Sequence, residues 1–225
     1  MNPLLEQWRA ELHIADRPDE YEIKALLARL GLRVPRGIRL LPGAGEVAPD
    51  FPGPYVAKVC TPDILHKTEC RGVHLNLTPE NLPAAIGTLS RAFPEASILV
   101  EQMIAFEGPE MIAGGLVDPS FGPAVMVGAG GLLTEILKDA AFRLAPLEET
   151  EALRMLAELQ IYPVFKGFRN LHMDAAAMAG LIVVVSRLVA ALGARFDQLD
   201  LNPIVWTAGG WTILDAKLVL HATHR

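Results

Sequence analysis

The sequence has few cysteines, few aromatic residues and no excess of positive charge. Its 225 residues include two cysteines, Cys60 and Cys70, which cannot form a disulfide framework and lack the paired spacing of a zinc site. Aromatic residues make up 6% of the chain and the net charge is −6, so a broad basic surface for nucleic acid or an anionic membrane is excluded. An anionic ligand would need a few local cations or backbone N–H groups.

Several common catalytic motifs are also missing. The sequence contains no GxxxxGK[ST] phosphate loop, no HExxH zinc motif and no GxSxG nucleophile motif. The glycine-rich run at 128–131 lacks the third glycine of a dinucleotide fingerprint. Any chemistry must therefore be argued from less familiar arrangements of residues.

The length and the composition predict a globular protein with a substantial core. Hydrophobic residues make up 51% of the chain and charged residues 20%, which is typical of one large domain or two small ones. Charged residues near the start stand where a signal peptide needs an apolar run, so we expect a cytoplasmic protein. The segment 175–194 is long enough to span a membrane, but Arg187 lies near its middle and Asp174 and Gly193 are typical helix caps. We predict a buried helix of a soluble core there.

Hydrophobic periodicity predicts helices and strands that do not alternate regularly, which favours an α+β fold over a doubly wound sheet. The predicted helices cover 18–32, 79–93, 147–159 and 175–194. The predicted strands cover 55–59, 73–77, 97–104, 110–117, 123–127, 198–206 and 211–220, and 133–138 fits either type. Segments 41–54 and 61–72 are predicted loops, and residues 1–17 are predicted to be peripheral.

One lysine stands out because lysine is the minority cation of this chain. Only six of the 20 lysine and arginine residues are lysines, and Lys58 lies inside the apolar predicted strand 55–59. A point cation in such a strand suits a phosphate oxygen. The alternative is a lysine on an edge strand that reaches water.

The loop and strand ends around Lys58 offer further candidates. His66 lies in the loop between two predicted strands, and a neutral imidazole with a free pKa of about 6.5 is a competent nucleophile near neutral pH, although a plain surface histidine fits equally. Gly72, after Arg71, is typical of a loop that approaches phosphate closely or of an ordinary turn. Glu101 follows an apolar run and Glu110 opens a strand, where each is either functional or a charge at the rim.

The C-terminal segment predicts a hairpin with a metal site. If Trp206 faces Trp211 across the turn, the same register places Asn202 opposite Asp215, with Asp200 two residues earlier on the same face. A few oxygen ligands of this kind suit Mg²⁺, which keeps water and nucleotide phosphates as its other ligands. The alternative is a solvated face of the hairpin.

These motifs together resemble the ATP-grasp (beta) subunit of ADP-forming acyl-CoA synthetases, the acetate–CoA ligase (ADP-forming) type, which is distantly similar to the nucleotide subunit of succinyl-CoA synthetase. The resemblance runs from about Arg17 to Leu220 and includes the stretches DEYEIKALLARLGLRVPRG, YVAKVCTPDILHKTECRGV, ILVEQMI and LDLNPIVW in this order. It implies an ATP-grasp fold with two α+β subdomains that clasp a nucleotide. The larger would comprise 1–34 plus 103–225, and the smaller 35–102.

The resemblance also assigns nucleotide-binding roles by matched position. Lys58 is similar to the phosphate-binding lysine of the family, and Gly72 lies in the loop that covers the phosphates. The segment from Glu101 to Met103 resembles the hinge that reads adenine, largely through its backbone. Glu110 resembles the acid that holds the ribose hydroxyls. These matches imply ATP or ADP as the ligand.

The resemblance further implies a metal and a covalent carrier. Asn202 and Asp215 match the two Mg²⁺ ligands, and His66 matches the second phosphorylated histidine of the family. This histidine takes a phosphoryl group from a histidine of an alpha subunit and passes it to ADP, in the reaction acyl-CoA + ADP + phosphate ⇌ acid + CoA + ATP. The chain would then need an alpha partner that carries the CoA-binding and first-histidine domains, in an α₂β₂ assembly. Relatives usually have glycine where this chain has Arg71.

Two other interpretations stay open at this point. A free-standing ATP-grasp ligase that acts through an acyl phosphate needs no phosphohistidine. A non-catalytic nucleotide-sensing module would bind ATP without phosphohistidine chemistry, and the departure at Arg71 is the feature that favours it.

Overall fold

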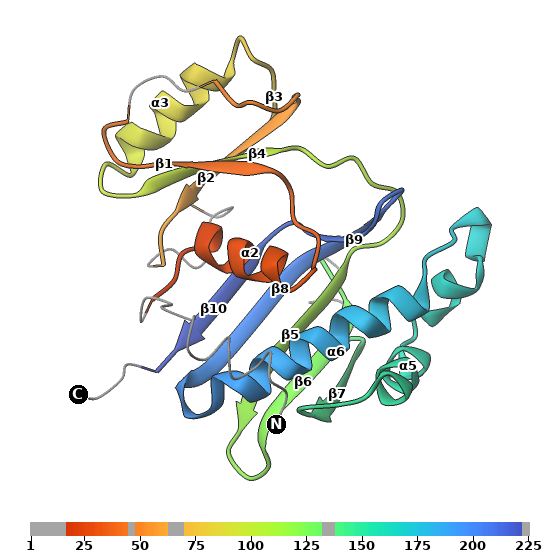
Figure 1. Ribbon diagram of the computed structural model, residues 1–225. Helices are drawn as coiled ribbons and strands as arrows, with labels where there is room; N and C mark the ends of the chain where they lie inside the picture. Colours follow the sequence, from red (N-terminus) through yellow and green to blue (C-terminus); the bar gives the residue numbers. More distant parts are fainter. Residues whose placement is uncertain (1–16, 45–47, 63–69, 132–137, 222–225) are drawn as a thin grey trace.

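The computed structural model describes residues 17–44, 48–62, 70–131 and 138–221, and these residues form helices and two antiparallel sheets (Figure 1). The four-stranded sheet has the order β1-β4-β2-β3, with bounds Gly37–Leu40, Ser97–Gln102, Tyr55–Cys60 and Val73–Leu77. The six-stranded sheet has the order β10-β8-β5-β6-β7, and β9 pairs with β8. Its strands β5 to β10 cover Met111–Asp118, Gly122–Ala129, Ala140–Leu144, Phe196–Thr207, Gly210–Ile213 and Ala216–Leu220. The predicted α+β class is confirmed.

The smaller sheet has β2 in its interior, covered by helix α3 (Leu82–Ala92). Every residue of β2 is buried, and the strand pairs with β4 on one side and β3 on the other. Lys58 therefore belongs to a central strand and is 7% exposed. The interpretation of Lys58 as an edge-strand lysine that reaches water is wrong.

The larger sheet packs against helices α5 (Glu149–Glu158) and α6 (Ala175–Leu192). Helix α6 begins at Asp174, whose side chain accepts a hydrogen bond from the backbone N–H of Ala177, and it ends at Gly193. Among the described helices it alone has the length and apolar composition of a membrane span, yet 61% of that stretch is buried inside the protein. It is the core helix that the sequence predicts.

Helix α2 (Glu20–Arg29) connects the two sheets, as its place between them in Figure 1 shows. Its N-terminus is a capping box in which Asp19 and Glu22 exchange hydrogen bonds with each other's backbone N–H. Arg39 of β1 donates to Asp19 at 2.6 Å, which ties the helix to the smaller sheet. The opposite face of the helix buries Leu27 in the core of the larger sheet. Side chains on α2 can therefore contact both sheets.

The predicted and observed elements differ in three places. Strands β1 and β7 were not predicted; each is an edge strand of only four or five residues, too short for an alternating pattern to distinguish it from a loop. The predicted strand 211–220 is two strands, β9 and β10, because Leu214 and Asp215 leave the ladder between them. Residues 1–16 and most of the predicted element 133–138 lie outside the described residues.

The described elements fall into two packed groups. The strands and the helix between residues 35 and 102 share one hydrophobic core, and α2 shares the other core with the elements after residue 103. We propose these groups as the two subdomains, 35–102 and 1–34 plus 103–225. The chain crosses between the two groups in the segment from α2 to β1 and in the segment from β4 to β5 (Figure 1).

Candidate active site

The C-terminal hairpin has the register that the sequence predicts. Trp206 of β8 faces Trp211 of β9, and the pairs formed by β8 with β10 keep the same register beyond the interruption. This register places Asn202 of β8 opposite Asp215 of the segment between β9 and β10. Asp200 lies two residues before Asn202 on β8, so it projects from the same face of the sheet.

Two of the residues on this face, Asp200 and Asp215, form an acidic pair. Burial raises the pKa of Asp200, the charge of Asp215 raises it further, and Lys217 acts in the opposite direction. Among the described residues, no group of three or more histidine, cysteine, aspartate or glutamate side chains is arranged to hold a metal ion by itself. The donor set nevertheless fits Mg²⁺, which commonly takes one or two carboxylates from the protein and the remaining ligands from phosphates and water. Asp215 and Asn202 would supply the protein oxygens.

A tight glycine turn after β6 brings a further candidate, Glu110, to the hairpin. The backbone N–H of Gly131 donates to the side-chain oxygen of Asn202 at 3.0 Å, and the N–H of Gly130 donates to the carbonyl of Glu110 at 2.8 Å. Gly131 has a φ of 56°, and a Cβ at this position would collide with the carboxylate of Glu110. The turn therefore requires glycine at this position and holds Glu110 close to the hairpin.

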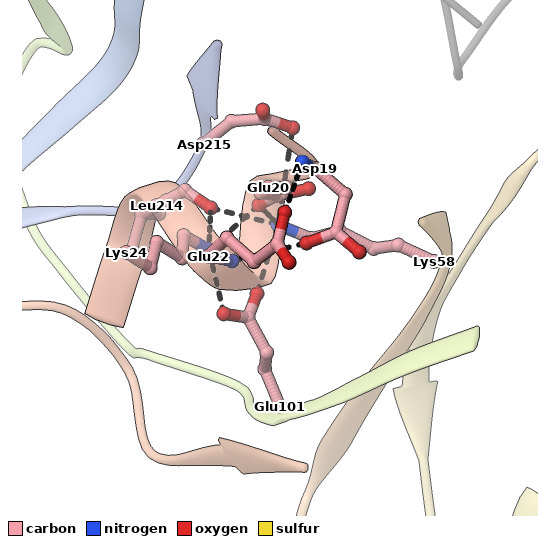
Figure 2. A network of polar contacts seen from close by, with 8 residues as sticks. All are labelled: Asp19, Glu20, Glu22, Lys24, Lys58, Glu101, Leu214 and Asp215. Carbon is pink, nitrogen blue, oxygen red and sulfur yellow. Dashed lines mark hydrogen bonds and ion pairs between the residues drawn. The ribbon is translucent and has the colours of Figure 1, made fainter. Parts of the chain in front are cut away.

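Lys58 lies in a buried group of four alternating charges, which we call the buried quartet: Glu20, Lys24, Lys58 and Glu101 (Figure 2). The Lys58 Nζ has three oxygen neighbours, Glu20 Oε1 at 2.9 Å, Glu101 Oε2 at 2.9 Å and the Leu214 carbonyl at 2.7 Å. The Lys24 Nζ has Glu20 Oε1 at 2.7 Å, Glu101 Oε1 at 2.6 Å and the same Leu214 carbonyl at 2.7 Å. Two ammonium groups and two carboxylates thus join α2, β2, β4 and the β9–β10 link.

The quartet keeps Lys58 charged in spite of its burial. Burial alone would lower the pKa of the Lys58 ammonium, but the charges of Glu20, Glu101 and Asp215 raise its pKa well above the ordinary value. The Asp215 carboxylate lies 3.9 Å from the Lys58 Nζ. The predicted phosphate cation and a predicted metal ligand are therefore neighbours, although they are 157 positions apart in the sequence (215 − 58).

In the predicted hinge, 101–103, the backbone N–H groups of Gln102 and Met103 already donate hydrogen bonds within the protein. Glu101 is 2% exposed and directs its carboxylate into the quartet. The backbone N–H of Met103 donates to the carbonyl of Pro54, and that of Gln102 donates to the carbonyl of Arg36, each at 2.8 Å. The structure thus gives Glu101 a side-chain contact to Lys58, and adenine reading by this segment stays a prediction.

A pocket of about 430 Å³ lies beside this segment. It is lined by residues 105–107, 171–173 and 206–208. None of the predicted site residues lines this pocket, so we place the candidate site at the quartet and the hairpin instead.

Comparison with known proteins identifies the family. The sequence profile of the ATP-grasp domain matches residues 13–220, which is nearly the whole chain. The chain belongs to the ATP-grasp family. The resemblance predicted from the sequence motifs, including the fold class, is thereby confirmed.

Its relatives within the ATP-grasp family are acyl-CoA synthetases. The beta subunit of the ADP-forming acetate–CoA ligase II of Pyrococcus furiosus is 36% identical over 214 residues, which are 89% of this chain and 90% of that protein. A crystal structure from Pyrococcus horikoshii matches with a TM-score of 0.79 and 31% identity, over 98% of this chain and 97% of that one. The dinucleotide-forming acetyl-coenzyme A synthetase 1 of Ca. Korarchaeum cryptofilum, solved with coenzyme A and Mg-AMPPCP, matches with a TM-score of 0.75 and 28% identity, over 96% of this chain and 98% of that one.

Sequence reasoning missed two members of the candidate site, Glu20 and Lys24. Both side chains lie on α2 four residues apart, and the predicted helix 18–32 was interpreted only through its apolar residues. The available signal was the position of this Glu–Lys pair on the same helix face as Leu27, since residues spaced by three or four positions share a face. A charged pair in line with core residues is a candidate for a buried ion pair.

The remaining predicted residues border the loop after β2. The carbonyl of Gly72 accepts a hydrogen bond from the N–H of Val59 at 2.8 Å, which places Gly72 one strand away from Lys58. His66 lies outside the described residues. Arg71 has a φ of 56°, in the left-handed region that glycine occupies without steric cost. A glycine at this position would adopt the same conformation without steric cost.

We expect Arg71→Gly to change the free energy of unfolding by less than about 1 kcal/mol, because relief of left-handed strain offsets the added flexibility of the unfolded chain. Arg71→Val should lower the free energy of unfolding by about 1–2 kcal/mol, since a β-branched residue fits φ values near 56° poorly. Chemical denaturation of the two variants and the parent chain measures both. A larger loss for glycine than for valine would contradict this account.

Proposed function

We propose that this ATP-grasp chain is the nucleotide-binding subunit of an ADP-forming acyl-CoA synthetase. The observation that carries the proposal is the meeting of Lys58 and Asp215 at 3.9 Å in a chain that aligns over 89% of its length with a beta subunit of such an enzyme. A phosphate-binding cation beside metal-binding oxygens is the arrangement that phosphoryl transfer requires. The reaction would be acyl-CoA + ADP + phosphate ⇌ acid + CoA + ATP, in the cytoplasm.

The residues of the site divide the work of binding nucleotide. Lys58 offsets the charge of the phosphates, and Asp215 and Asn202 hold Mg²⁺ by their side-chain oxygens. Bound Mg²⁺ would offset the negative charge that the phosphates share during transfer. The Glu110 carboxylate accepts hydrogen bonds from the ribose hydroxyls. The glycine turn at Gly131 lies against this carboxylate and holds it in place. Gly72 belongs to the loop over the phosphates, and the segment from Glu101 to Met103 lies beside adenine.

His66 would be the covalent carrier. Its imidazole nitrogen attacks the phosphorus of the phosphohistidine on the partner, so a new N–P bond forms as the partner's N–P bond breaks; ADP then takes the phosphoryl group and becomes ATP. The Korarchaeum enzyme has a phosphohistidine segment that points towards its nucleotide site, which supports this step. In the sequence, His66 follows Pro62 by four positions, and Pro62 comes shortly after the end of β2, the strand of Lys58. A segment of four residues spans at most about 14 Å, so the sequence keeps His66 within reach of this end of β2.

The partner would be an alpha subunit that carries the CoA-binding and first-histidine domains. The matched Pyrococcus furiosus protein is named as a beta subunit, which supports a two-subunit enzyme. We propose an α₂β₂ assembly. The chain alone should then bind nucleotide but form no acyl-CoA.

A labelling experiment tests this function. The chain is mixed with Mg²⁺, γ-labelled ATP and an acyl-CoA synthetase alpha subunit from the same organism, and label is followed on each chain. We expect label on this chain that is lost in acid and kept in base, as phosphohistidine requires, followed by label on the alpha subunit. Acid and CoA should then discharge the label and yield acyl-CoA.

Two other outcomes would each replace the proposal. Acyl phosphate formation by this chain alone, without label on protein, would identify a free-standing ligase. Tight binding of ATP with no label on either chain would identify a nucleotide-sensing module.

A further inference from the structure

The Lys58 ammonium group, which we propose binds phosphate, is already fully occupied by contacts within the protein. An ammonium group has three N–H donors. The Lys58 Nζ already has three oxygen neighbours within 2.9 Å, from Glu20, Glu101 and the Leu214 carbonyl. To bind a nucleotide phosphate, Lys58 must therefore exchange at least one of these partners for a phosphate oxygen.

The two carboxylates would oppose this exchange if Lys58 were their only cation. Glu20 and Glu101 are 4% and 2% exposed, and a buried carboxylate without a counter-charge is costly. Two buried negative charges facing one cation would hold that cation in place. An exchange with phosphate would leave both carboxylates without compensation.

Lys24 provides the missing compensation. It contacts the same Glu20 Oε1 and the same Leu214 carbonyl as Lys58, and it contacts the other oxygen of Glu101. Its three distances, 2.6–2.7 Å, are as short as those of Lys58 or shorter, and its side chain is 5% exposed. Figure 2 shows dashed contacts from both lysine side chains to the Glu20 and Glu101 carboxylates. After Lys58 has turned to a phosphate, Lys24 still contacts both carboxylates, so one buried negative charge rather than two is left without a cation.

We propose that Lys24 is a positioning residue that stays paired with Glu20 and Glu101 when Lys58 turns to a nucleotide phosphate, and that this pairing lowers the cost of the exchange. This inference rests on the proposed nucleotide site and goes beyond it, because it assigns a role to a residue that does not itself contact nucleotide. It predicts that phosphate affinity depends on the charge balance of the quartet. Removal of a positive charge from the quartet weakens phosphate binding, whereas removal of a negative charge does not.

The test measures the dissociation constants of ATP and adenosine for four proteins by calorimetry. These are the parent chain, Lys24→Met, Glu20→Gln and the double variant Lys24→Met/Glu20→Gln. We expect Lys24→Met to weaken ATP binding about tenfold or more, with adenosine affinity unchanged. Glu20→Gln should leave ATP binding equal or tighter, and the double variant should recover most of the loss. Arg143→Met is the matched control, since it removes a cation from the separate ion pairs with Glu151 and Glu158.

The outcomes separate this role from a merely structural one. If Lys24 only supported packing, Glu20→Gln would also weaken ATP binding and the double variant would be worse than either single variant; that pattern overturns the proposal. Parent-like ATP affinity in folded Lys24→Met also overturns it. If Lys24→Met does not fold, the sign of the Glu20→Gln effect decides alone. Failure of the parent chain to bind ATP would instead reject the proposed function.

Discussion

Replacement of His66 by alanine is expected to reduce acyl-CoA synthesis by about a thousandfold or more while leaving the dissociation constant of ATP within about twofold of the parent value. Alanine has no nitrogen that can form the phosphoramidate bond, so the phosphoryl group has no covalent route between nucleotide and alpha subunit. Nucleotide affinity should persist, because the substitution leaves the proposed nucleotide contacts of Lys58, Asp215 and Asn202 in place.

The measurement combines steady-state acyl-CoA formation with calorimetry of ATP, using the chain assembled with its alpha subunit. His74→Ala is a suitable control, since His74 is a half-buried histidine of the adjacent strand β3 and has no assigned role. Retention of substantial synthesis in His66→Ala would contradict the relay. A parallel loss of ATP binding would indicate that the loop binds nucleotide rather than carrying phosphate.

The C-terminal hairpin, formed by β8, β9 and β10, shows how much of the candidate site the sequence alone could predict. The pairing of Trp206 with Trp211 follows from turn residues and alternation, so the sequence was sufficient to bring Asn202 level with Asp215. The interruption of the ladder at Leu214 lies opposite Pro203, which has no backbone N–H to donate to the Leu214 carbonyl. The sequence could not indicate that Lys24 and Lys58 would donate to this carbonyl instead, because both come from distant segments.

The buried quartet illustrates the limit of sequence reasoning more sharply. Lys58 was identifiable from its apolar strand, but the sequence could not indicate that α2 would bring Glu20 within 3 Å of it and Lys24 to the same carboxylates. The identity of a charged residue does not reveal its partner when the two are far apart in the chain. Edge strands β1 and β7 were missed for a related reason, since their pairing partners rather than their own composition make them strands.

The largest expected effect on stability comes from Lys58→Met, which should lower the free energy of unfolding by about 3–5 kcal/mol. The substitution keeps the length of the side chain but removes its charge, so Glu20 and Glu101 lose one of the two lysines of the quartet that pair with them. One buried negative charge is then uncompensated, and Asp215 adds to it from 3.9 Å away from the former ammonium position. Urea denaturation of the isolated chain measures the loss.

A second substitution shows whether charge is the cause of that loss. Glu20→Gln in the Lys58→Met background restores one cation to one carboxylate, so we expect the double variant to recover more than half of the lost stability. Arg143→Met should cost no more than about 1 kcal/mol, because its ion pairs with Glu151 and Glu158 lie at the surface. If the double variant were less stable than Lys58→Met, the quartet would be held together by side-chain packing and not by its balance of charge. A recovery in stability combined with absent ATP affinity would place Lys58 in both roles, as the counter-ion of the quartet and as the cation for phosphate.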